Sequence, residues 1–120
     1  MTIKLSQVTF DCADPPRLAG FWADVVQGAV AAGANEHVAL VPGGADVPTL
    51  LFIRVPEGKT AKNRVHLDLG CADLDAERER ILSLGATHVH DKQEWGVTWS
   101  TFLDPEANEF CVGRHPELFD

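Results

Sequence analysis

Short apolar stretches alternate with polar breaks along the chain, and their spacing predicts the secondary structure. Apolar residues dominate 3–11 and 64–70, and each stretch runs into a helix-start signal, which predicts two strands. After the first, Asp14 suits an N-cap, two prolines suit the first helical turn, and apolar residues recur every three or four positions to Val26. A second helix is predicted to begin after Asp73. The remaining apolar runs predict strands at 29–32, 37–41, 50–55, 86–90, 97–103 and 109–114.

The same order of elements occurs twice. The tripeptide Cys-Ala-Asp begins at Cys12 and again at Cys71, 59 positions later (71 − 12), and in this register each half reads strand–helix–strand–strand–strand. The polar stretch 56–62 connects the halves. A four-stranded sheet with one helix leaves one face uncovered, so two copies are expected to pair. We therefore predict one α+β domain over 1–120, whose tandem βαβββ modules, 1–56 and 63–114, form one curved eight-stranded mixed sheet with an inner groove.

Composition excludes several classes of protein. A length of 120 residues suits a single domain, and a net charge of −8 with no basic cluster argues against a nucleic-acid partner. No apolar run reaches the roughly 20 residues of a membrane span, and the N-terminus lacks a signal-peptide pattern. Three widely spaced cysteines argue against a disulfide framework. We expect a cytoplasmic protein with neither a nucleic-acid nor a membrane partner.

Three segments carry a resemblance to a known superfamily. They are NRVHLDL at 63–69, DLDAERERILSLGA at 73–86 and WSTFLDPEANEFCV at 99–112. The chain resembles the vicinal-oxygen-chelate superfamily, which includes glyoxalase I, extradiol dioxygenases and bleomycin- or fosfomycin-resistance proteins, and looks most like its small bacterial glyoxalase-like group. The resemblance implies an incomplete barrel, a homodimer and a small organic ligand in the concave sheet. It does not choose among the many functions that this fold supports.

The resemblance also implies where a metal would bind. By the repeat register, the family's four ligand positions fall on Gln7, Ile53, His66 and Cys111. Gln7 and His66 are residues that the family uses there, whereas Ile53 cannot be a ligand and Cys111 replaces the glutamate of the family pattern D-P-x-G-N-x-x-E. We therefore expect a degraded metal site and no cofactor. The alternative is a divalent ion such as Zn²⁺, held by His66, Gln7 and Cys111, because a thiolate favours softer ions.

Strand alternation selects the other candidate site residues. If His66 points into the groove, Asp68 does so too, and we expect His66 and Asp68 to be the catalytic residues, with Asp68 orienting His66 or acting as a general base. The alternative for Asp68 is a carboxylate satisfied by cross-strand hydrogen bonds. The expected ligand pocket comprises Gln7, Thr9, Phe52, Ile53, Trp95, Trp99 and Cys111.

Several side chains are expected to have structural roles. Cys12 and Cys71 should pack under the helices as small apolar residues, and Trp22 should lie in the core. His88 and His90 are expected on one face of an edge strand. Ala107 occupies a turn position where the family has glycine, so we expect a left-handed alanine or a shifted turn there, at a cost on the order of 1 kcal/mol.

These observations favour two functions. The first is a glyoxalase-like protein that binds a small organic molecule in the concave sheet, with lyase or isomerase chemistry if the degraded site still holds a metal. The alternative is a non-catalytic, drug-sequestering protein of the bleomycin-resistance kind, with an acidic, tryptophan-lined groove for a cationic ligand. A third option is a folded relic with an apolar pocket and no ligand.

Overall fold

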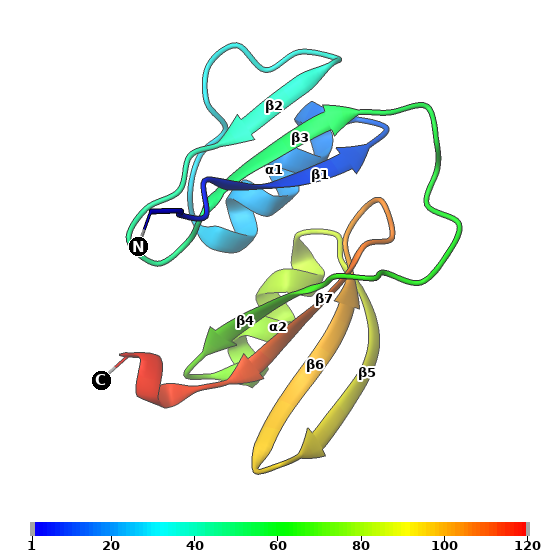
Figure 1. Ribbon diagram of the computed structural model, residues 1–120. Helices are drawn as coiled ribbons and strands as arrows, with labels where there is room; N and C mark the ends of the chain where they lie inside the picture. The colour runs from blue at the N-terminus through cyan, green and yellow to red at the C-terminus, as the bar shows by residue number, and fades with distance from the viewer. Residues whose placement is uncertain (1, 120) are drawn as a thin grey trace. The chain divides into compact units, whose positions relative to one another are not determined.

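The computed structural model describes residues 2–119, and the chain divides into two compact units with their boundary between Gly58 and Lys59. We call residues 2–58 unit 1 and residues 59–119 unit 2, and describe each by itself (Figure 1). The boundary lies inside the predicted connector, 56–62. That the two units form one domain stays a prediction. Neither α-helix in residues 2–119 is long and apolar enough to cross a membrane.

Unit 1 is a three-stranded mixed sheet with one helix. Its central strand is β3, which runs parallel to β1 and antiparallel to β2 (Figure 1). The elements are β1 (Gln7–Cys12), α1 (Pro15–Val26), β2 (Val38–Val41) and β3 (Thr49–Arg54).

Unit 2 repeats this arrangement with a further strand. Its sheet has the order β4-β7-β6-β5, in which β4 and β7 are parallel and the other pairs are antiparallel. The elements are β4 (Leu67–Cys71), α2 (Leu74–Ser83), β5 (Thr87–Glu94), β6 (Val97–Leu103), β7 (Glu109–Arg114) and the 3₁₀-helix η1 (Pro116–Phe119). The α+β class is confirmed by both units.

Both helices begin at the predicted caps. The Asp14 carboxylate accepts a hydrogen bond from the backbone N–H of Arg17 at 3.3 Å, and the Asp73 carboxylate accepts one from Ala76 at 3.1 Å. These side chains satisfy backbone donors that have no partner inside the first turn of a helix. The sequence signal was local, and the caps form where it placed them.

The predicted number of eight strands is wrong for the residues that the structure describes. The structure has seven strands between residues 2 and 119, in sheets of three and four, and neither sheet closes into a barrel. The missing strand is 29–32, where only the hydrogen bond from the Ala31 N–H to the Leu40 carbonyl, at 2.8 Å, links the segment to β2. Its sequence is Ala-Val-Ala-Ala, followed by Gly33 in a turn, and alanine has low β-propensity and little apolar area to bury.

The helix-facing side of each sheet forms the core. Phe10 packs against Trp22 of α1 and stacks on Phe52, with ring centroids 5.4 and 5.0 Å apart. Phe52 is fully buried, so its expected place in the pocket is wrong. Ile53 was predicted for the same pocket, but neighbouring residues on a strand face opposite sides of the sheet. Cys12, Cys71 and Trp22 are buried, as expected.

A β-bulge separates the two histidines of β5. The register of β5 against β6 shifts between His88 and His90, so His88 pairs with Phe102 and His90 with Thr101. The His88 ring contacts Phe102 edge-on at 5.7 Å on the core side, whereas His90 lies on the other face. The expectation that both would share a face is wrong, because the extra residue of a bulge reverses the alternation.

Candidate ligand and metal site

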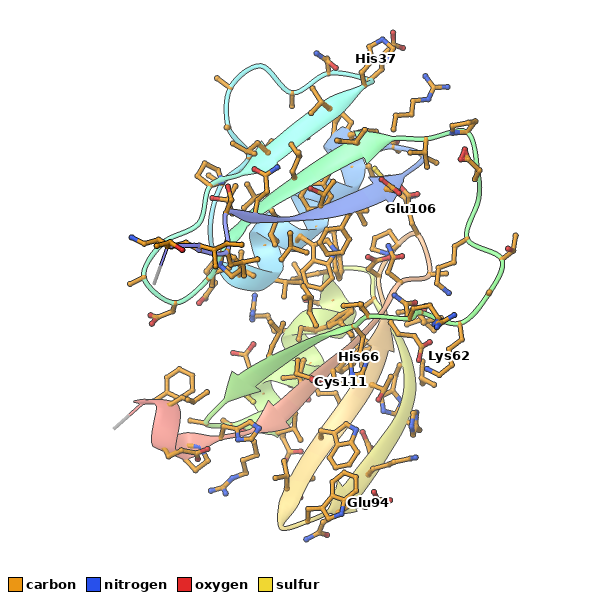
Figure 2. All side chains as sticks on the ribbon, viewed as in Figure 1. His37, Lys62, His66, Glu94, Glu106 and Cys111 are labelled. Atoms are coloured by element: carbon orange, nitrogen blue, oxygen red, sulfur yellow. The ribbon has the colours of Figure 1, made fainter. Side chains whose placement is uncertain are left out.

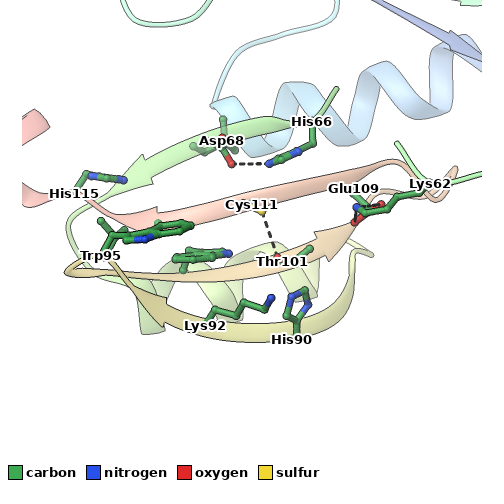
Figure 3. Close-up of a pocket in the computed structure, with 14 residues that line it drawn as sticks. Lys62, His66, Asp68, His90, Lys92, Trp95, Thr101, Glu109, Cys111 and His115 are labelled. Carbon is green, nitrogen blue, oxygen red and sulfur yellow. Dashed lines mark hydrogen bonds and ion pairs between the residues drawn. The ribbon is translucent and has the colours of Figure 1, made fainter. Parts of the chain in front are cut away.

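One face of the unit 2 sheet carries a pocket of about 500 Å³ (Figure 3). On β6 the Ser100 hydroxyl accepts a hydrogen bond from Arg78 of α2, so its neighbours Trp99 and Thr101 point away from the helix. The pocket therefore opens on the face that does not carry α2. It is lined by Lys62, His66, Asp68, Leu69, His90, Lys92, Trp95, Val97, Trp99, Thr101, Glu109, Cys111, Gly113 and His115.

Three side chains with metal-ligating atoms meet in this pocket. His66 lies just before β4, Asp68 lies on β4, and Asp68 pairs in register with Cys111 of the neighbouring β7. Their ligating atoms all lie within 4.8 Å of one another, and His66 Nε2 is 3.2 Å from Asp68 Oδ1. Figure 2 labels His66 and Cys111, which lie near each other in unit 2. Cys111 Sγ also lies 3.3 Å from the Thr101 hydroxyl, across to β6.

The environment of Cys111 keeps its thiol protonated. Burial is the main cause that raises the pKa of the Cys111 thiol; the Thr101 hydrogen bond opposes this increase, and the negative charge of Asp68 adds to it. A thiol with a raised pKa is a poor nucleophile at neutral pH, because the thiolate is the reactive form. Cys111 therefore lines the pocket as a protonated thiol, which forms only weak hydrogen bonds.

The donors in this cluster fit a borderline-soft ion better than a hard one. An imidazole nitrogen, a carboxylate oxygen and a thiol sulfur suit Zn²⁺, which needs three protein ligands and an open position in catalytic sites. Bond lengths around Zn²⁺ require ligating atoms roughly 3.5 Å apart. The side chains of His66 and Asp68 are 46% and 73% exposed, so they have room to rotate toward such an ion. The residues present therefore fit zinc, after the thiol has lost its proton.

The predicted metal set was His66, Gln7 and Cys111, and the structure brings His66 and Cys111 together with Asp68 as the third donor. Gln7 belongs to unit 1, where it shares a sheet face with Thr9 and Ile53, all three of them exposed. A contribution of Gln7, Thr9 or Ile53 to this pocket stays a prediction.

The register that made Ile53 the counterpart of Cys111 is wrong. Cys111 pairs with Asp68, and the counterpart of Asp68 in unit 1 is Thr9, which pairs with Leu51. Leu51 therefore occupies the position equivalent to Cys111, and Ile53 the position equivalent to Gly113. The last hairpin loops differ in length, seven residues at 42–48 and five at 104–108, so one offset cannot hold for the whole repeat. Leu51 and Ile53 are both apolar, so unit 1 has no metal ligand at this position.

Two tryptophans form the aromatic side of the pocket. Trp95 and Trp99 stack with ring centroids 6.2 Å apart and planes inclined by 10°. Trp95 lies at the tip of the β5–β6 hairpin with a φ of 50°, and the residue is 88% exposed. Both of these predicted residues line the pocket.

Sequence reasoning missed most of the charged side chains of the pocket. Lys62 is bound to Glu109 by two contacts of 3.0 Å, and His115 lies 3.0 Å from Glu117. Counting every second residue from Cys111 through Gly113 would have placed His115 on the pocket face. Lys92 and His90 could not be found in this way from Trp99, because their place depends on the register between β5 and β6. The full set of missed charged or titratable lining residues is Lys62, His90, Lys92, Glu109 and His115.

The part of the expected acidic groove that lies on unit 2 is not acidic. Its lining has two lysines against Asp68 and Glu109, a formal sum of zero (2 − 2), together with three neutral histidines. The net charge of −8 therefore comes from side chains outside this pocket. The argument for a cationic ligand, which depended on an acidic groove, does not hold for unit 2.

The fold and site define a duplicated α+β protein with a pocket on one sheet. The profile of the glyoxalase-like domain family matches residues 7–113. The chain belongs to this family. No curated protein matches the sequence significantly.

Solved structures share the fold at low sequence identity. A glyoxalase/bleomycin resistance protein/dioxygenase family enzyme from Burkholderia phytofirmans PsJN is 15% identical, with a TM-score of 0.78 over 93% of this chain and 98% of that chain. The fosfomycin resistance protein FosX from Listeria monocytogenes is 13% identical, with a TM-score of 0.77 over 96% and 95%. Lactoylglutathione lyase from Agrobacterium tumefaciens is 15% identical, with a TM-score of 0.68 over 97% and 96%. A variant of the Listeria protein was solved with Mn(II) and 1S,2S-dihydroxypropylphosphonic acid.

Proposed function

We propose that this chain binds a small organic molecule in the pocket of unit 2. The observation that carries the proposal is the tryptophan pair, in which Trp99 is half-buried and Trp95 is exposed. Trp95 is 88% exposed at a left-handed backbone position, which is an unfavourable place for a large apolar side chain unless the ring is used. Stacking on Trp99 holds the ring over the pocket, and polar groups converge at its other end. An apolar surface with a few placed polar groups is typical of ligand sites.

The three tryptophans of the chain provide a direct test. We expect the indole N–H resonances of Trp95 and Trp99 in ¹⁵N-labelled protein to shift when a ligand binds, while Trp22, which is 1% exposed in the core of unit 1, serves as an internal reference. The probes are three bicyclic aromatics of one shape: 2-naphthoate, 2-naphthamide and 2-naphthylmethylamine. Saturable shifts with at least one probe support the proposal.

A matched pair of variants assigns the binding to the pocket. Trp95→Ala should remove the shift at Trp99, whereas Phe119→Ala, which removes an exposed aromatic ring outside the pocket, should leave it unchanged. If none of the probes moves the two indole signals up to millimolar concentration, the pocket is not a site for aromatic molecules and the proposal fails.

Metal-assisted lyase or isomerase chemistry is the second candidate, and the cluster of His66, Asp68 and Cys111 favours it. A bound zinc ion would supply Lewis-acid stabilisation of a substrate oxygen. The three side chains would hold the ion, so Asp68 could not then serve as the general base. Equilibrium dialysis should show one zinc per chain, lost in Cys111→Ser and His66→Ala but kept in His37→Ala, which alters an exposed histidine of unit 1 (Figure 2). Equal zinc uptake by all three variants would contradict this assignment.

A drug-sequestering role of the bleomycin-resistance kind would need the pocket without the metal. The cationic probe, 2-naphthylmethylamine, tests it in the same experiment. Preference for that probe would support sequestration of a cation.

A further inference from the structure

We propose that the ligand of this pocket is a flat aromatic acid, a ring system that carries a carboxylate, with its ring against Trp95 and its carboxylate at Lys92 and His90. This inference rests on the proposed function and names the chemical class of the ligand. Three features of the pocket carry it: the open tryptophan face, the pairing of the charged groups and the register of β5.

The first feature is the shape of the aromatic surface. Trp95 and Trp99 are nearly parallel, and the large exposed fraction of Trp95 leaves ring surface open to solvent. A planar ring extends such a stack with its face, which an aliphatic group cannot do, and stacked aromatic pairs gain about 0.5–1.5 kcal/mol beyond their buried area. A pocket of about 500 Å³ has room for a bicyclic ring system.

The second feature is the distribution of charge among the lining residues. Lys62 is neutralised by Glu109, His66 contacts Asp68, and His115 contacts Glu117. Among the residues that the structure describes, Lys92 and His90 have no ion pair and no side-chain hydrogen bond. Lys92 is therefore the lining cation whose charge is not already compensated.

The third feature is the place of these two side chains beside the tryptophans. Lys92 pairs in register with Trp99, and His90 pairs with Thr101, so both point to the pocket face of β5 (Figure 3). Directly opposed residues on one face have Cβ atoms about 5 Å apart, which places the ammonium group within reach of a substituent on a ring stacked at Trp95 or Trp99. An ammonium and an imidazole N–H can both donate to one carboxylate.

The other end of the pocket would not hold the carboxylate as well. The Asp68 carboxylate is 73% exposed there, and its charge repels a second anion. The acid group is thus directed to the β5 side, and the uncharged part of the ligand faces His66 and Cys111.

The net charge of the chain does not reverse this preference. A total of −8 disfavours anions at long range, but charges more than about 8–10 Å away are largely screened at physiological ionic strength. Lys92 would act on the carboxylate at contact distance. The local pairing of charges therefore decides which ligands bind.

The three naphthalene probes test the ligand class, because they share one ring system and differ in charge. We expect 2-naphthoate to bind wild-type protein more tightly than 2-naphthamide, by about three- to tenfold in Kd, the range of a partly exposed ion pair. 2-Naphthylmethylamine should bind most weakly. Binding is read from the indole N–H signals of Trp95 and Trp99.

Charge reversal provides the matched control. Lys92→Glu should reverse the order of the acid and the amine, whereas Lys59→Glu, which makes the same change outside the pocket, should keep the wild-type order. Lys92→Gln should bring naphthoate and naphthamide to similar affinity, and the amide spectrum of each variant reports that it is folded. Equal binding of acid and amide by wild-type protein, or an unchanged preference in Lys92→Gln, overturns the inference and leaves the proposed function intact. Failure of all three probes overturns both.

Discussion

Ala107 shows how a single residue can carry strain that its sequence context predicts. It adopts a φ of 67°, in a turn where the Asp104 carbonyl accepts a hydrogen bond from its N–H at 2.9 Å. The Asp104 carboxylate also accepts hydrogen bonds from the N–H groups of Glu106 and Asn108. These bonds hold the turn in place, and of the two outcomes expected from the sequence, a left-handed alanine or a shifted turn, the first is confirmed.

Replacing Ala107 with glycine should stabilise the protein. A left-handed backbone conformation costs an L-residue roughly 1–2 kcal/mol, and glycine removes this cost. Part of the stabilisation is offset because glycine loses more backbone entropy on folding than alanine does. We expect Ala107→Gly to raise the free energy of unfolding by about 0.5–1 kcal/mol, which is about 2–5 °C in Tm. Ala72→Gly, the same change at an exposed alanine without a positive φ, should lower Tm instead. A Tm for Ala107→Gly at or below that of wild type would show that the turn is not strained.

At the scale of elements, a polar cluster fastens the edge strand β5 to the rest of unit 2. Asp91 of β5 accepts a hydrogen bond from the Ser100 hydroxyl of β6, and its carboxylate lies 2.9 Å from His88 Nε2. Arg78 of α2 donates a hydrogen bond to Ser100 at 3.2 Å and lies 3.6 Å from Asp91. The cluster joins a helix to two strands around the β-bulge, on the side of the sheet away from the pocket.

Because of this cluster, the stability of unit 2 should decrease at acid pH. The Ser100 hydrogen bond, and after it that of His88, lowers the pKa of Asp91 below its usual 3.8. A carboxyl group whose pKa is lowered by folding stabilises the native state above its unfolded pKa, and this contribution is lost as pH falls through the folded value.

We therefore expect Asp91→Asn to destabilise the protein at pH 7 by about 0.5–1 kcal/mol, because the carboxylate is partly exposed, and the difference from wild type should shrink below about pH 4. Urea unfolding at pH 7 and pH 3 measures both effects. Asp46→Asn, in a loop of unit 1, removes the same charge and should change little at either pH. A constant difference for Asp91→Asn across this range would show that the charged form of Asp91 does not stabilise the fold.

For the whole molecule, the two copies of the module have diverged in different ways. Unit 1 has one strand fewer than unit 2, and it has Thr9 and Leu51 where unit 2 has Asp68 and Cys111. Unit 2 holds the cluster of His66, Asp68 and Cys111, the tryptophan pair and the charged groups of the pocket. The candidate site residues that meet in one pocket therefore lie in the second copy. The homodimer implied by the family resemblance stays a prediction. Light scattering would test it, because a dimer has twice the 13.0 kDa mass of one chain.

Much of the fold could be predicted because its signals are local. The caps at Asp14 and Asp73, the buried Cys12 and Cys71, and the repeat that relates them depend on neighbours within a few residues. The predicted strand at 29–32 of unit 1 is the exception, because its short alanine-rich sequence does not form a strand. Of the candidate site, His66, Asp68, Cys111, Trp95 and Trp99 lie together in one pocket, whereas Phe52 does not.

The sequence by itself determined the repeated units, their helix starts and the family, since these depend on short-range patterns and motifs. Tertiary structure decided which side chains meet. Asp68 joins Cys111 across two strands, and Lys92 and His90 come to the tryptophan face, only through the pairing of β4 with β7 and of β5 with β6. Loop lengths and a single bulge set that register, and each added residue reverses the face that a side chain occupies. The pocket's neutral charge and its one uncompensated lysine therefore became visible only in the folded chain.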